Sequence, residues 1–227
     1  MGSVFLVRHA TTAASAAGTN LGQADDAPLL PNGESLAGRL GAAIALELAA
    51  MPHGEIRLIS SPARRCRATG EAIASAIGLD AQAQVEEGLR ELDYGSWEGL
   101  TAEECRRRDP VLRAAWEADP YAVHAPGGES GADVAARAFP VLESIEGWLA
   151  AAGDRVAIVV SHNHVIRLRL ATLLAIPLPD YRRRLSIEPG SYSVVTFASE
   201  PMQTTVRRIG ALPPPDAANG GSEGWHL

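Results

Sequence analysis

The first apolar run of the chain is Val4-Phe5-Leu6-Val7, and it is followed directly by the polar residues Arg8-His9-Ala10-Thr11-Thr12. The run is nearly continuous rather than alternating, which is typical of a strand whose two faces are both covered. It is also far shorter than a signal peptide requires. We therefore expect it to form the first strand of a sheet.

Two further apolar runs share this pattern, and a late strand is expected after them; the three lie at 56–59, 156–160 and 192–198. Alanine- and leucine-rich stretches with helical spacing lie at 34–50, 64–77, 131–151 and 165–174. Because strands and helices alternate, the sequence predicts a three-layer α/β/α sandwich. Its central sheet should be mainly parallel, with helices on both faces.

The chain has 227 residues, of which 46% are hydrophobic, so it can bury one substantial core. We expect a single catalytic domain over residues 1–212. Within it, charged residues mix with Trp116 and Tyr121 between 101 and 130, which indicates a mostly helical insertion or lid over a site. Residues 213–227 are rich in Pro, Gly, Asn and Ser and are expected to form a tail.

The formal net charge is -7, which argues against a broad basic surface for nucleic acid or anionic lipid. No stretch offers the roughly 20 apolar residues that a membrane span requires. Cys66 and Cys105 are too few and too distant for a disulfide framework or a zinc site, and indicate two reduced thiols. We expect a cytoplasmic protein that acts on a small molecule.

Polar residues follow each of the three buried runs. Arg8-His9 follows the first, Ser61-Pro62 with Arg64 and Arg65 follows the second, and Ser161-His162 follows the third. In open α/β sheets, ligands bind in the crevice outside the carboxyl ends of the strands. These side chains are therefore expected to line one pocket.

Such a pocket suits phosphoryl transfer. The transferred group spreads negative charge over three oxygens, which fixed cations and N–H donors can meet. Arg8, Arg65 and His162 are suited to that role. Imidazole can form a covalent phosphoenzyme, and His9 is the better candidate for the nucleophile because it is tied to the first strand.

The leaving oxygen needs a proton, which a partly buried carboxylic acid can give. Glu91 and Asp93 are both candidates, and spacing alone does not separate them. The same carboxylate could later deprotonate water, so no metal is required. No carboxylate cluster resembles a magnesium site, and His162 with His164 would be two zinc ligands without a third. We expect no metal and no cofactor.

The quoted blocks resemble those of a known family. Leu6-Val7-Arg8-His9-Ala10-Thr11-Thr12 resembles the Arg-His-Gly-x-Thr signature of the histidine phosphatase superfamily, also called phosphoglycerate mutase-like. Ser61-Pro62-Ala63-Arg64-Arg65-Cys66-Arg67-Ala68-Thr69 is similar to its Ser-Pro-Leu-x-Arg-Ala-x-Gln-Thr segment. This second resemblance places the phosphate-binding arginine at Arg65.

Three later blocks extend the resemblance to about residue 198. Leu89-Arg90-Glu91, followed by Gly95-Ser96-Trp97-Glu98-Gly99, is similar to the family's Leu-x-Glu and Gly-x-Trp-Glu-Gly block and implies that Glu91 is the proton donor. Val160 to Arg167 resembles the second-histidine segment and implies that His162 contacts phosphate. Pro126 to Ser130 resembles a Gly-Gly-Glu-Ser segment of the phosphatase branch, or is simply a turn with a Ser helix cap.

Three residues depart from the family pattern at the expected pocket wall. Ala10 stands where Gly is usual, and it fits only if its φ is negative. Asn163 replaces the Gly after the second histidine and can keep the turn or donate its amide. Ser15 stands where many members have Asn and keeps a shorter hydrogen-bond donor. Ser15 and Asn163 are predicted to contact substrate, as is Thr12, whose hydroxyl either binds phosphate or caps a helix.

The resemblance implies a metal-independent phosphomonoesterase of the histidine acid phosphatase type, which works through a phosphohistidine. One alternative is a phosphoglycerate mutase-like phosphomutase, and another is a catalytically weak phosphate-binding module, which Ala10 and Asn163 motivate. The partner is a small phosphorylated substrate, and the sequence leaves open whether the chain forms a homodimer. The runs 106–108 and 182–184, all arginine, are interpreted as solvated faces.

Overall fold

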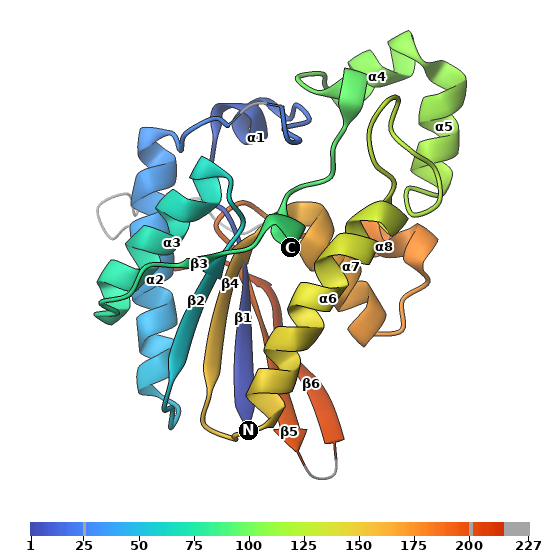
Figure 1. Ribbon diagram of the computed structural model, residues 1–227. Coiled ribbons are helices and arrows are strands. Elements are labelled where there is room, and N and C mark those ends of the chain that lie inside the picture. The colour runs from blue at the N-terminus through green and yellow to red at the C-terminus, as the bar shows by residue number, and fades with distance from the viewer. Residues whose placement is uncertain (25, 200–201, 216–227) are drawn as a thin grey trace, which may run out of the picture.

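The structure, a computed structural model, describes residues 1–24, 26–199 and 202–215 (Figure 1). Within them a six-stranded sheet has the order β3-β2-β4-β1-β5-β6. Its strands are β1 (Gly2–Arg8), β2 (Ile56–Ser60), β3 (Gln84–Val85), β4 (Val156–Ser161), β5 (Tyr192–Ser199) and β6 (Met202–Ala211). β1, β2, β3 and β4 are mutually parallel, β5 pairs antiparallel with β1, and β6 pairs antiparallel with β5, which confirms the mainly parallel sheet.

Helices cover both faces of this sheet. The longer ones are α2 (Pro31–Ala49), α3 (Arg64–Ile77), α6 (Gly131–Ala150) and α7 (Asn163–Leu173). Figure 1 shows α2 and α3 on one face and α6 and α7 on the other, as the three-layer prediction requires. All four match predicted helices, although α2 begins earlier, at Pro31, because proline suits the first turn of a helix.

The continuous apolar run of β1 reflects two separate cores. Phe5 and Val7 pack in the core that also contains residues of α2 and α3. Val4 and Leu6 pack on the opposite face, with residues of α6 and α7. Successive side chains of a strand point to opposite faces, so a strand covered on both sides has no polar position to alternate with.

The short helices lie toward the carboxyl ends of the parallel strands. They are α1 (Ala13–Ala17), α4 (Ala102–Arg108), α5 (Pro110–Ala118) and α8 (Tyr181–Arg184), with 3-10 turns η1 (Glu87–Leu89), η2 (Gly95–Trp97) and η3 (Leu178–Asp180). Figure 1 shows α4 and α5 projecting beyond that edge, and the predicted helical content of 101–130 is confirmed.

Two strands were not predicted. They are β3 and β6, which lie at the two edges of the sheet. The predicted tail at 213–227 is described only at 213–215, which form neither helix nor strand, and the rest of it lies outside the described residues. Among the described helices, none is sufficiently long and apolar to cross a membrane.

Candidate active site

The predicted convergence of the two histidines is present in the structure. Arg8 of β1 is in register with Ser161 of β4, so His9 and His162 leave the sheet side by side. Their ring centroids lie 5.3 Å apart with an interplanar angle of 65°. The next strand, β2, ends at the same edge, and the backbone N–H of Ser61 donates to the carbonyl of Val160 at 2.9 Å.

His9 is buried and held in one orientation. Its Nδ1 atom lies 2.8 Å from the carbonyl oxygen of Ala10, and since a carbonyl only accepts, Nδ1 carries the proton. The Nε2 lone pair is then available to attack. Burial, reinforced by the charges of Arg65 and Arg8, holds the pKa of His9 well below its usual value. The ring is therefore neutral at neutral pH, which is the form in which an imidazole can act as a nucleophile.

His162 is engaged through both ring nitrogens. Arg65, buried in the first turn of α3, approaches Nδ1 with its Nη2 at 3.3 Å and also donates to the carbonyl of Gly22 at 3.0 Å. A guanidinium only donates, so Nδ1 accepts and Nε2 carries the proton, which it donates to Ser61 Oγ at 2.8 Å. Ser61 lies in a quoted block, but no role of its own was predicted for it.

Arg8 ends β1 and is partly buried. Its Nη1 donates to the carbonyl of Ile187 at 2.5 Å, while its Nε atom has no hydrogen-bond partner among the described residues. Burial lowers its pKa from the usual value, and Glu91 opposes that shift. Arg8 therefore presents a positive charge with unused donor capacity beside His9.

Glu91 rather than Asp93 faces the site. Its buried carboxylate accepts from the backbone N–H groups of Leu92 at 2.9 Å, Asn163 at 3.1 Å and His164 at 3.2 Å. The last two are the first amides of α7, which are free to donate outward at a helix start. Asp93 instead accepts from the backbone N–H of Gly95 at 2.7 Å, within its own turn.

Two cavities meet at Glu91. The larger, of ≈ 200 Å³, is also lined by Arg8, His9 and Asn163, and the smaller, of ≈ 130 Å³, by Arg65 and His162. All five predicted catalytic side chains thus surround connected space. A buried neutral imidazole, two guanidinium groups and one carboxylate have the composition that phosphoryl transfer requires.

The predicted substrate-binding residues are placed differently from one another. Ser15 and Asn163 line the larger cavity. Thr12 is fully buried and caps α1: its hydroxyl accepts from the backbone N–H of Ser15 at 3.2 Å, and its own N–H donates to Ser15 Oγ at 2.8 Å. The capping interpretation of Thr12 is confirmed, and its contact with phosphate stays a prediction.

Ala10 meets the condition that its φ is not positive. Among the described residues other than glycine, only Ala175 has a positive φ, so Ala10 is not strained. Its N–H donates to Thr69 Oγ1 at 3.0 Å. The methyl group therefore replaces the usual glycine hydrogen without forcing the backbone away from the site.

Arg137 of α6 was missed by the sequence analysis. Its guanidinium donates to the carbonyls of Gly88 at 2.8 Å, Arg90 at 2.7 Å and Glu91 at 2.9 Å, and to Glu129 Oε2 at 2.8 Å. It therefore fixes the segment that carries Glu91. No local pattern distinguishes it from a surface arginine of an amphipathic helix. Its partner Glu129 belongs to the quoted Gly-Gly-Glu-Ser block.

The same block ends in a helix cap. Ser130 caps α6, with its side chain accepting from the backbone N–H of Asp133. The simple interpretation of this block as a capped turn is confirmed. Glu129 adds a second function, because it also accepts from the N–H of Asp93 at 2.9 Å and from Gln23 Nε2 at 3.2 Å.

The arginine run 182–184 is not uniformly solvated. Arg183 and Arg184 are exposed, as predicted, and the structure also pairs them with Asp180. For Arg182 the prediction is wrong, because its guanidinium stacks 4.4 Å from the ring centre of Trp116 and the residue lines the larger cavity. A sequence run of like charges does not show which member turns inward.

The fold and the site together define a phosphoglycerate mutase-like α/β enzyme. The sequence profile of the histidine phosphatase superfamily (branch 1) matches residues 4–209, and the chain belongs to this superfamily. The family assignment predicted from the sequence blocks is therefore confirmed.

Relatives with assigned activities support this membership. A glucosyl-3-phosphoglycerate phosphatase of Mycolicibacterium vanbaalenii is 32% identical over 183 residues, which cover 78% of this chain and 76% of the relative. A probable phosphoglycerate mutase of Yersinia enterocolitica is 30% identical over 203 residues, 87% and 86% of the two chains. The solved structure of a mycobacterial glucosyl-3-phosphoglycerate phosphatase, 26% identical, superposes with a TM-score of 0.75 over 93% of this chain and 100% of that one.

Proposed function

We propose that this protein is a metal-independent phosphomonoesterase that hydrolyses a small phosphorylated metabolite through a phosphohistidine at His9. The observation that carries the proposal is the orientation of His9: its Nδ1–H is bonded to Ala10, so its Nε2 lone pair is free in a cavity shared with Arg8 and Glu91. The phosphatase relative supports hydrolysis as the outcome.

The reaction proceeds in two displacements. In the first, His9 Nε2 forms a bond to phosphorus, the bond to the ester oxygen breaks, and Glu91 gives its proton to the departing oxygen. In the second, the Glu91 carboxylate takes a proton from water, the water oxygen bonds to phosphorus, and the N–P bond breaks. Arg8 and Arg65 stabilise the charge on the transferred group in both steps.

Metal independence follows from this division of roles. Arg8 and Arg65 offset the phosphoryl charge that a divalent cation would otherwise offset, and Glu91 carries the proton in both steps. The described residues also hold no group of three His, Cys, Asp or Glu side chains placed to bind a metal. The two cysteines are free, which fits a reducing compartment, and we include a cytoplasmic location in the proposal.

A phosphomutase is the second candidate, because a probable phosphoglycerate mutase is among the relatives. A mutase returns the phosphoryl group to a second oxygen of the substrate instead of giving it to water. It should need a bisphosphate primer and release little phosphate, whereas the phosphatase should release phosphate stoichiometrically with the alcohol.

The test is a panel of phosphate esters incubated with chelator, with released phosphate measured and the protein analysed by mass spectrometry after acid-free quenching. The wild type should release phosphate and carry a phosphoryl group on His9. His9→Ala should lose both, while His53→Ala, which removes an exposed imidazole, should lose neither. Turnover retained in His9→Ala, or turnover that requires added metal, would refute the proposal. Ester binding without turnover by the wild type would instead indicate a phosphate-binding module.

A further inference from the structure

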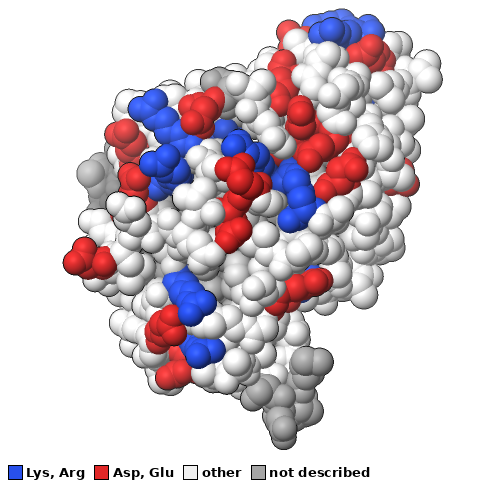
Figure 2. All heavy atoms as spheres, viewed as in Figure 1, with Lys and Arg blue, Asp and Glu red and all other residues white. Residues whose placement is uncertain are grey.

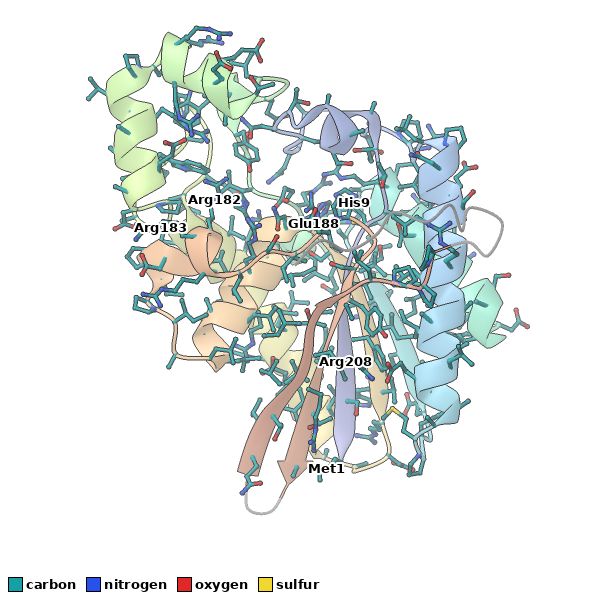
Figure 3. The ribbon with its side chains drawn as sticks, turned by 180° about the vertical axis from the view of Figure 1, so that it is seen from behind. Met1, His9, Arg182, Arg183, Glu188 and Arg208 are labelled. Atoms are coloured by element: carbon teal, nitrogen blue, oxygen red, sulfur yellow. The ribbon has the colours of Figure 1, made fainter. Side chains whose placement is uncertain are left out.

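Arg182 lies beside the nucleophile without a counter-ion among the described residues. It enters the same cavity of ≈ 200 Å³ as His9, and its Nε atom is buried there without a hydrogen-bond partner among those residues. Figure 3 labels Arg182 and His9 at a similar height, above the sheet, with Glu188 labelled between them. The Glu188 carboxylate accepts from Ser186 Oγ at 2.9 Å.

The Arg182 side chain is held in place before any ligand binds. Its guanidinium lies over the face of Trp116, at 4.4 Å from the ring centre. Trp116 is itself fully buried and packs against Trp97, with ring centroids 5.8 Å apart. A guanidinium stacked on a fixed aromatic ring loses little freedom on binding, so its donors are pre-organised.

A second arginine adds to the positive charge. Arg167 of α7 is partly buried, and its Nε atom also lacks a partner among the described residues. Burial, followed by the charges of Arg182 and Arg8, lowers the pKa of Arg167 to about 10. The guanidinium groups of Arg8, Arg167 and Arg182 therefore repel one another here.

Two buried arginines elsewhere among the described residues are paired with carboxylates. Arg113 pairs with Glu117 at 2.8 Å, and Arg169 pairs with Glu146. Uncompensated buried charge is costly, and the cost is removed when a partner of opposite sign arrives. Arg182 and Arg167 have no such carboxylate partner among the described residues. This indicates that an anionic ligand supplies the opposite charge beside them.

The transferred phosphate does not account for this ligand. In the proposed mechanism it binds between His9 and His162, where Arg8 and Arg65 supply the positive charges. Arg65 and His162 line the smaller cavity, and Arg182 lines the larger one together with Arg8, His9 and Glu91. Since Glu91 must reach the leaving oxygen, the part of the larger cavity between Glu91 and Arg182 is the space available to the leaving group.

We propose that Arg182 binds a second anionic group on the leaving-group side of the substrate, so that the enzyme prefers phosphate monoesters that carry an additional carboxylate or phosphate. Arg167 strengthens the positive potential of this subsite. The inference rests on the proposed function, because it assumes that the ligand of the larger cavity is the leaving group of the hydrolysed ester.

The experiment compares matched esters. In the carboxylate arm, 3-phosphoglycerate is compared with glycerol 3-phosphate, in which a hydroxymethyl group replaces the carboxylate. In the phosphate arm, 1,3-propanediol bisphosphate is compared with propyl phosphate. The wild type should prefer the ester with the additional anion by about 10-fold or more in kcat/KM in at least one arm, mainly through KM. The arm with the larger preference identifies the anion.

Variants assign the preference to Arg182. Arg182→Gln keeps a planar group over Trp116 but removes the charge, and it should reduce the preference to about threefold or less; Arg182→Lys should retain part of it. Arg183→Gln, at the exposed neighbouring position, is the control and should keep the full preference. Thermal melting of each variant checks that the fold is intact.

The outcomes separate this inference from the proposed function. A wild type that hydrolyses both members of each pair equally would overturn the role of Arg182 and leave the phosphatase assignment standing. So would an Arg182→Gln variant that keeps the preference. Calorimetric Kd values for the same four esters on His9→Ala make the comparison without turnover, and equal affinities within both pairs would overturn the inference even if no ester is hydrolysed.

Discussion

The imidazole rings of His9 and His162 lie 5.3 Å apart, edge to face, and both are buried. Two imidazolium ions could not share this space beside Arg65 without strong repulsion. Burial and the nearby arginines hold the pKa of each ring well below its usual value. The pKa of His164 is also held well below its usual value, mainly by burial and next by the charges of Arg182 and Arg167.

These three histidines predict that the protein loses stability in mild acid. In the unfolded chain they take up protons as the pH falls through about 6.5, whereas in the folded protein they stay neutral. The free energy of unfolding should therefore be constant above about pH 7.5 and fall below it, by up to about 1.4 kcal/mol per pH unit for each histidine. Urea denaturation between pH 8 and pH 5 measures this slope.

The slope can be assigned by substitution. His164→Gln removes one buried imidazole and should flatten the dependence on pH, whereas His53→Ala removes an exposed imidazole and should leave it steep. Stability that stays level between pH 7.5 and pH 5.5 would contradict the neutral, buried state of these rings.

The proton-transfer role proposed for Glu91 predicts a dependence on the leaving group. Glu91→Gln should reduce kcat/KM by about 10²- to 10⁴-fold for alkyl phosphates, whose leaving oxygen needs a proton. The loss should be much smaller for 4-nitrophenyl phosphate, whose phenolate leaves unaided, and phosphohistidine should accumulate because water attack is slowed. Rapid-quench analysis of both substrates measures the two steps.

Asp93→Asn is the matched control for Glu91→Gln. Asp93 accepts a hydrogen bond within its own turn, which the amide oxygen of Asn can still accept. Its leaving-group dependence should be that of the wild type. If Glu91→Gln slows alkyl and aryl substrates equally, Glu91 only positions other groups and does not transfer the proton.

The strand-end rule explains why so much of the candidate site was predictable. His9, Arg65 and His162 each follow a buried strand or begin the helix after it, so predicting the strands placed all three at one edge. Glu91 follows no such strand, and the residues alone did not distinguish it from Asp93 as the proton donor. Only the family resemblance separated them, and the structure then placed Glu91 between the two cavities.

The features that were not predicted share one property, which is that no local sequence pattern marks them. β6 carries Thr204, Arg207 and Arg208 on a largely exposed edge, so it lacks the apolar run that marks β1 and β4. Figure 2 shows arginine and acidic side chains interspersed over the visible face, a pattern in which no single arginine stands out. Arg137 and Arg182 owe their roles to tertiary packing against residues distant in sequence, which local spacing does not record.

Cys66 provides a prediction about chemical reactivity. Its Sγ atom lies 3.4 Å from Nε2 of His162, yet burial raises the pKa of its thiol to about 12, with Arg65 only partly opposing the shift. Burial also raises the pKa of Cys105. Because the thiolate is the reactive form, neither residue should react with iodoacetamide at pH 8 in the folded protein.

Mass spectrometry gives the number of alkylated thiols. We expect none within an hour in buffer and two in 8 M urea, since both cysteines are free. Rapid alkylation of Cys66 in the folded state would show that the second histidine is open to solvent, which would conflict with the buried site described above.

Arg137 provides the last prediction, because one guanidinium satisfies three backbone carbonyls and the Glu129 carboxylate. Arg137→Met keeps most of the apolar stem but removes the hydrogen bonds to these four acceptors, each worth about 0.5 to 1.5 kcal/mol. The free energy of unfolding should fall by about 3 kcal/mol, and kcat/KM should fall about 10-fold because the segment carrying Glu91 loosens. Arg107→Met, whose exposed pair with Glu103 contributes little, should cost under about 0.5 kcal/mol and keep full activity. Equal effects of the two substitutions would show that Arg137 is an ordinary surface residue and that Glu91 is positioned by the amides of α7 alone.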